Sequence, residues 1–121
     1  MSNAPDLDDY FVLPDGLPKI TPADDTRLTN AVDFTIERDG HTIGNILRMQ
    51  LLRDPTVIFA GYKVPHPLES HVIVKVQTNN DSTPVEAMVR AIKCLVKELD
   101  GIATSFKSQV ESTHDPHQGY Q

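Results

Sequence analysis

Apolar residues recur along the last third of the chain at alternating spacings of three and four. The positions of this repeat are Val85, Met88, Ile92, Leu95, Leu99, Ile102 and Phe106. The spacing predicts a helix over residues 84–111 with a continuous apolar seam along one side. A second apolar stripe runs beside the seam and widens it to three heptad positions. Its members are Val89, Val96, Ala103 and Val110.

The predicted helix is longer than the domain that must cover it. At about 1.5 Å per residue it spans on the order of 40 Å, whereas small domains are roughly 30 Å across. Part of the seam should therefore extend beyond the domain. Burying an aliphatic or aromatic side chain contributes about 1.5 to 3 kcal/mol, so an uncovered seam favours association with a partner. The alternative is that a sheet covers the whole seam and the chain is a monomer.

A strand and a shorter helix are predicted upstream. Val32, Phe34 and Ile36 alternate with polar residues, which indicates a strand over residues 32–38 with one solvated face. Residues 41–53 have apolar side chains at helical spacing, and the following Asp54-Pro55 ends the helix. The apolar positions of this helix are Ile43, Ile46, Leu47, Met49, Leu51 and Leu52.

This shorter helix also has more apolar surface than one contact requires. Gly44 in its interior costs up to about 1 kcal/mol relative to alanine, and a close approach of another helix would explain that cost.

Two further strands, 56–64 and 71–78, flank a proline-rich turn and should pair as a hairpin. In the first of them Val57 and Phe59 are expected on one side of the sheet. Thr83, Pro84 and Glu86 then have the spacing of a capping box, which starts the long helix.

The ends of the chain have a different composition. Residues 1–30 are rich in proline and form an irregular arm, in which residues 10–13 are the candidate for a short edge strand. Residues 112–121 are polar and read as a tail. The region 31–111 is thus an α+β domain, a small mostly antiparallel sheet with two helices on one face.

Composition excludes several classes of function. The formal net charge of −6 argues against a direct grip on a nucleic-acid backbone, which needs clustered Lys and Arg. The single cysteine, Cys94, forms no disulfide framework, fits a reducing compartment and is expected to be a buried free thiol. The acidic N-terminus lacks the pattern of a secretion signal or a membrane span, so we expect an intracellular protein.

Candidate chemistry is sparse, and we predict no catalytic residue, no metal and no cofactor. His66 and His71 flank a loop at a spacing that matches no common zinc pattern, and His114 and His117 lie in the tail. His41 begins the shorter helix, where a hydrogen bond to local backbone is expected. Nucleophile elbows, phosphate-binding glycine loops and His-Glu-x-x-His helices do not occur, so an enzyme hypothesis depends on an unmarked pocket.

One stretch carries a more specific signal than periodicity. From Glu37 the chain reads Glu-Arg-Asp-Gly-His-Thr-Ile-Gly-Asn, and after eleven residues it continues as Val-x-Phe-x-Gly-Tyr, three more residues, and His-Pro. This resembles the signature of the small α-like subunits of eukaryotic and archaeal RNA polymerases. The signature positions are His41, Thr42, Gly44, Asn45, Val57, Phe59, Gly61, Tyr62, His66 and Pro67.

The resemblance implies the dimerisation fold of the bacterial polymerase α subunit and a non-catalytic assembly role. Such subunits pair with a larger α-like partner through their first and last helices, and the pair is the platform for the two large catalytic subunits. On the first helix the implied interface comprises Ile43, Gly44, Ile46, Leu47, Met49 and Leu51. On the long helix it comprises Met88, Ile92, Leu95, Leu99, Ile102 and Phe106.

Within this family the chain is most similar to members from RNA polymerase II, through Asn3-Ala4-Pro5-Asp6, residues 59–69 and Val76-Gln77-Thr78. That likeness implies a nuclear protein whose partner is the larger, third subunit. The equivalent subunit of RNA polymerases I and III and a self-pairing α+β module remain alternatives.

The family commonly has two acids directly before the signature histidine, whereas this chain has Asp39-Gly40. Asp39 or Thr42 is therefore expected to cap the first helix.

Overall fold

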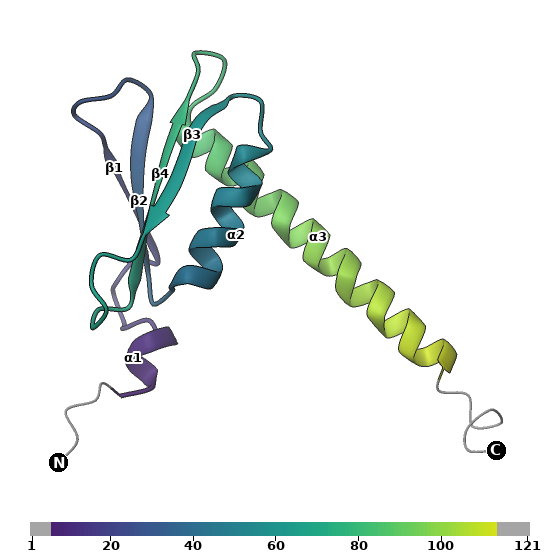
Figure 1. Ribbon diagram of the computed structural model, residues 1–121. Helices are drawn as coiled ribbons and strands as arrows, with labels where there is room; N and C mark the ends of the chain where they lie inside the picture. The colour runs from purple at the N-terminus through teal and green to yellow at the C-terminus, as the bar shows by residue number, and fades with distance from the viewer. Residues whose placement is uncertain (1–5, 114–121) are drawn as a thin grey trace.

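The computed structural model describes residues 6–113, and backbone alone for residues 9 and 10. Four strands form one antiparallel sheet in the order β1-β2-β4-β3, and α2 and α3 lie on one face of it (Figure 1). The α+β class predicted from the sequence is confirmed. The elements are α1 Asp8–Phe11, β1 Ile20–Asp24, β2 Ala31–Glu37, α2 His41–Leu52, β3 Val57–Lys63, β4 His71–Thr78 and α3 Pro84–Thr113.

The edge strand is not where the sequence placed it. Residues 10–13 were predicted as a strand, but the chain is helical over Asp8–Phe11, and the added strand is β1. Pro22 in β1 pairs with Phe34 of β2 at the edge of the sheet. A proline is tolerated there because its missing N–H leaves no ladder bond unmade on the solvent side.

The core lies between the sheet and the two helices. Strand β4, and β2 from Val32 onward, alternate between buried and half-buried residues, as a sheet covered on one face requires. The sheet contributes these buried side chains to the core cluster: Val32, Phe34, Ile36, Ala60, Val72, Val74 and Val76. From the helices they meet Leu47, Leu51, Ala87, Met88 and Ala91.

The β3–β4 hairpin is confirmed, with one irregularity. Val57 pairs with Thr78 and Phe59 pairs with Gln77, so Ile58 is an extra residue in β3. This bulge puts Val57 on the face with the buried Thr78 and leaves Phe59 on the opposite face. The prediction that Val57 and Phe59 share a face is therefore wrong.

Asp25 ties the loop after β1 to the sheet. One carboxylate oxygen accepts hydrogen bonds from the backbone N–H groups of Arg27 and Leu28 at 2.7 and 3.1 Å, and the other pairs with Lys75 Nζ at 2.8 Å. The Lys75 hydrogen bond and the two backbone donors lower the pKa of Asp25 to about 2.

Candidate partner interface

The helix α3 has a defined start. The Glu86 N–H donates to Thr83 Oγ1 at 3.2 Å, and Pro84 occupies the first helical position, where its missing N–H costs nothing. Only half of the predicted capping box forms, because the Glu86 carboxylate accepts from Ser82 Oγ at 3.5 Å instead of returning to Thr83. The helix continues to Thr113, two residues beyond its predicted end.

The proximal half of α3, residues 84–95, packs against the sheet and α2. Its buried residues are Pro84, Ala87, Met88 and Ala91, and Ile92 and Leu95 pack against the core while half-buried. Burial ends there, although the helix has 30 residues and a length of about 45 Å. Figure 1 shows α3 leaving the domain and projecting away from it.

The distal half, residues 96–113, carries the same apolar seam into solvent. At about 100° per residue, Leu99, Ile102 and Phe106 fall on the line defined by Met88 and Leu95. Met88 is 3% exposed, whereas Leu99, Ile102 and Phe106 are 57%, 65% and 68% exposed. The hypothesis that the sheet covers the whole seam is therefore wrong.

The second stripe is open along its full length. Val89 lies in the proximal half, Val96 begins the distal half and Val110 lies near the end of the helix, and all three are exposed. Val89 and Val96 point about 80 to 100° away from Met88, whereas Val110 points about 40° away and lies beyond the part of the helix that packs against the sheet. Together the two stripes make a broad apolar surface on α3.

The helix α2, which the sequence predicted as the first helix, adds a smaller apolar patch. Ile46, Met49 and Leu52 are exposed, whereas Gly44, Leu47 and Leu51 are buried against the sheet. Gly44, Leu47, Leu51 and Met88 were predicted on the partner surface; the structure corrects this, because they belong to the chain's own core. The uncovered surface is the interface patch: Ile46, Met49 and Leu52 on α2 with Val89, Val96, Leu99, Ile102, Phe106 and Val110 on α3.

The structure brings three signature residues together at the start of α2. The Tyr62 hydroxyl lies 3.2 Å from His41 Nδ1, and the Tyr62 ring packs directly over Gly44. A Cβ at position 44 would approach the ring to 2.5 Å, so only glycine fits. The close approach at Gly44 is thus to a strand, not to another helix as predicted. The His41 side chain correspondingly contacts Tyr62 and not the local backbone.

The remaining signature residues lie apart from this group. Asn45 accepts from the Arg48 side chain at 2.6 Å, and Gly61 lies under the Phe59 ring. His66 and Pro67 are exposed in the β3–β4 loop. Asp39 pairs with Lys19 at 2.7 Å, and the cap residue of α2 is Gly40, which has no side chain to offer. No cap from Asp39 or Thr42 is observed in the described region.

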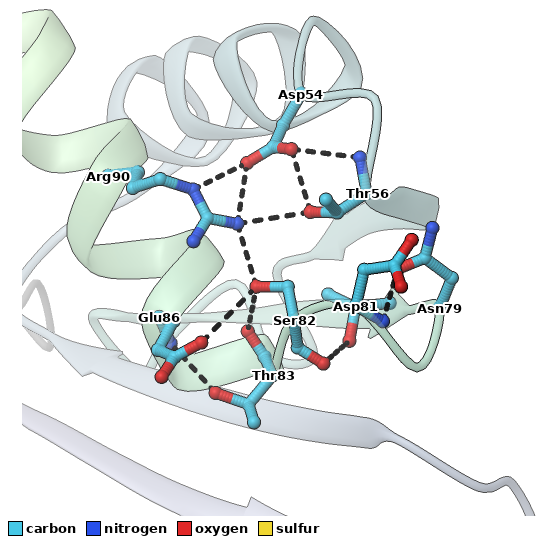
Figure 2. Close-up of polar contacts among 9 residues, drawn as sticks. Asp54, Thr56, Asn79, Asp81, Ser82, Thr83, Glu86 and Arg90 are labelled. Atoms are coloured by element: carbon cyan, nitrogen blue, oxygen red, sulfur yellow. Dashed lines mark hydrogen bonds and ion pairs between the residues drawn. The ribbon is translucent and has the colours of Figure 1, made fainter.

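A polar cluster, which sequence reasoning missed, joins α3 to the turn before β3. We call Asp54, Thr56, Ser82 and Arg90 the Arg90 cluster (Figure 2). Arg90 donates to Asp54 Oδ2 at 2.9 and 3.0 Å, to Thr56 Oγ1 at 3.0 Å and to Ser82 Oγ at 2.8 Å. The second Asp54 oxygen accepts from the Thr56 N–H and hydroxyl.

Burial raises the pKa of Asp54, but hydrogen bonds from Thr56 and Arg90 outweigh it and leave the pKa below its ordinary value. The Asp54 carboxylate is therefore charged at neutral pH, and both of its oxygens have hydrogen-bond donors within the cluster.

Reactive chemistry is not concentrated anywhere in the described part of the chain. Residues 6–113 contain no group of three or more His, Cys, Asp or Glu placed to hold a metal ion. His114 and His117 lie outside the described residues. Cys94 is exposed on α3, which corrects the prediction of a buried thiol. Within the same range no helix has the length and apolar character needed to cross a membrane.

Comparisons with known proteins agree with this geometry. Residues 31–105 match the RNA polymerase Rpb3/Rpb11 dimerisation domain. The chain is 49% identical over 109 residues to DNA-directed RNA polymerase II subunit rpb11 of Dictyostelium discoideum, covering 90% of this chain and 91% of that one. It is 46% identical over 122 residues to the probable subunit RPB11 of Caenorhabditis briggsae, with 98% of each chain covered.

A solved structure shares the fold. DNA-directed RNA polymerase subunit L from Thermoplasma acidophilum superposes with a TM-score of 0.65 at 20% identity, covering 84% of this chain and 99% of that chain. This likeness supports the architecture alone.

The fold and the interface patch together define a dimerisation domain of the α-like class. The chain belongs to the family of the RNA polymerase Rpb3/Rpb11 dimerisation domain. Its similarity to the subunits named RPB11 extends over nearly the whole sequence. The family resemblance predicted from the signature is confirmed.

Proposed function

We propose that this chain is a non-catalytic assembly subunit of RNA polymerase II that pairs with the larger α-like third subunit. The single observation that carries the proposal is the interface patch, a row of apolar side chains that the chain's own fold leaves uncovered. Large exposed apolar patches mark interaction surfaces. Relatives at 46–49% identity are named as RNA polymerase II subunits.

The pair would act as the platform for the two large catalytic subunits, in the nucleus. This chain would position the enzyme without touching its substrates. Its net charge of −6 supports a role without direct nucleic-acid contact. The similarity to polymerase II subunits favours that enzyme over RNA polymerases I and III.

Coexpression tests the proposal. The full chain is produced alone and together with the larger α-like subunit, and each preparation is sized in solution. We expect the chain alone to associate non-specifically, and the coexpressed pair to elute as a one-to-one complex. A freely soluble monomer that does not bind the larger subunit would overturn the proposal. A discrete homodimer that excludes it would instead establish the self-pairing module.

A further inference from the structure

The Arg90 cluster joins α3 to the turn between α2 and β3. It connects the turn between α2 and β3, through Asp54 and Thr56, with the loop before α3, through Ser82, which is distant from that turn in sequence (Figure 2). Arg90 itself is on α3. One guanidinium group therefore fixes the helix relative to the sheet and to α2.

The packed contacts of α3 leave its direction weakly determined. Full burial covers only Pro84 to Ala91, and three of the four buried residues are small. Beyond them Ile92 and Leu95 pack against the core only while half-buried. Small side chains offer few interlocking contacts against rotation about the contact point. From Ala91 to Val110 the helix runs about 28 Å at about 1.5 Å per residue, so a tilt of about 10° would move its end by about 5 Å.

A displacement of that size matters for recognition. Ridges on one helix fit grooves on another only within a spacing of about one helical turn, which is about 5.4 Å. The interface patch is divided between α2 and α3, so a partner must meet both helices at their correct relative angle. The angle between the two helices therefore determines whether a partner can contact the apolar residues of both.

We propose that Arg90 is a positioning residue for partner binding, which holds α3 at the angle that aligns its apolar stripe with the α2 patch. This inference rests on the proposed function. Asp54 is the counterpart of Arg90, because both of its oxygens are committed to the cluster and it is largely shielded from water. The second link between these elements, Arg53 to Glu98 at 3.1 Å, is exposed on both sides and contributes little.

The test combines a distance measurement with partner binding. Spin labels are placed by Thr21→Cys on β1 and Ser108→Cys on the outer side of α3, in a Cys94→Ser background, and the labelled chain is diluted with unlabelled chain. The distance distribution is measured for the free chain, and association and dissociation rates with the larger α-like subunit are measured separately. Arg90→Ala is compared with Lys93→Ala, an exposed cation one turn further along the same helix.

For Arg90→Ala we expect the distance distribution to broaden at least twofold and the association rate to fall at least tenfold, at unchanged helix content. Arg90→Lys keeps the charge without the guanidinium fork. Its distance distribution and its association rate should be intermediate between those of Arg90→Ala and the parent chain. Lys93→Ala should change neither quantity. If Arg90→Ala does not fold, Arg90→Lys provides the same comparison at smaller amplitude.

Two results would overturn the inference: an unbroadened distribution in a folded Arg90→Ala, or a broadened one with unchanged partner kinetics. If the parent chain does not bind the larger subunit, the proposed function fails. The part of the inference that concerns recognition fails with it, while the angle-setting role is decided by the distance distribution alone.

Discussion

The two halves of α3 carry one apolar repeat in two different surroundings. In the proximal half Met88 is covered by the sheet, whereas in the distal half Leu99, Ile102 and Phe106 on the same line face solvent. The difference arises because the sheet ends before the helix does. An apolar side chain therefore stabilises the fold in one half and is available to a partner in the other, without any change in residue type.

The strongest test of this contrast is a charge in the proximal half. Met88→Asp places a carboxylate in the core, where an unpaired charge costs several kcal/mol against a total stability of about 5–15 kcal/mol. We expect the chain to lose cooperative unfolding in a urea titration followed by circular dichroism. Met88→Leu should cost less than about 1.5 kcal/mol. Full stability of Met88→Asp would show that this half is not core.

The same change in the distal half should separate folding from pairing. Leu99→Asp with Ile102→Asp should alter the free energy of unfolding by no more than about 0.5 kcal/mol per site, because both side chains are exposed. Affinity for the larger α-like subunit should fall at least 100-fold, about 2.7 kcal/mol. Leu95→Asp, at a half-buried position, should impair both properties.

Ser108→Asp is the control for these variants, since it adds a carboxylate to the outer side of the distal half, away from the apolar seam. Binding by the double variant at parental affinity would contradict the assignment of the patch.

Two helical glycines, one packed against the sheet and one in open space, test the same contrast with a single added methyl group. Gly44→Ala would press a methyl group into the Tyr62 ring, and we expect a loss of about 1–3 kcal/mol, reduced by the helix preference of alanine. Gly101 in the distal half has no neighbour within 4 Å of an added Cβ. Gly101→Ala should therefore raise helix content, with a gain of up to about 1 kcal/mol. Equal effects at both positions in thermal melts would argue against this difference in packing.

A pH titration examines the sheet independently of α3. The pKa of Asp25 is about 2 in the folded chain, below its ordinary value of 3.8, so the charged form stabilises the fold above that ordinary value. This contribution is lost as the pH falls from about 4 to about 2. Asp25→Asn should lower the melting temperature at pH 6, and the deficit should shrink toward pH 2. A deficit that stays constant with pH would contradict the role of the charge.

Much of the architecture follows from short-range patterns. Alternation in residues 32–36 predicted a strand with one covered face, and the heptad spacing predicted a long helix, because both reflect which side of an element meets the core. The strand predicted over residues 10–13 is wrong, because an apolar run of four residues does not distinguish a strand from a helical turn. Pro22 is compatible with β1 only because that strand lies at an edge.

The division of the seam could not be read from the sequence. Met88 and Ile102 occupy the same position of the heptad repeat, and only the extent of the sheet decides which is buried. The partner of Gly44 was equally hidden, since Tyr62 lies on another element. Arg90 gave no signal at all, because a cation on a helix surface has the same pattern whether it is solvated or bound to Asp54 and Ser82.

Amide hydrogen exchange along α3 tests the central claim most directly. Exchange is followed in the free chain and in its complex with the larger α-like subunit. A partner that covers the distal half should slow exchange at least tenfold in residues 96–113 and leave residues 84–91, already packed against the sheet, nearly unchanged. A complex that forms with no added protection in residues 96–113 would contradict the account.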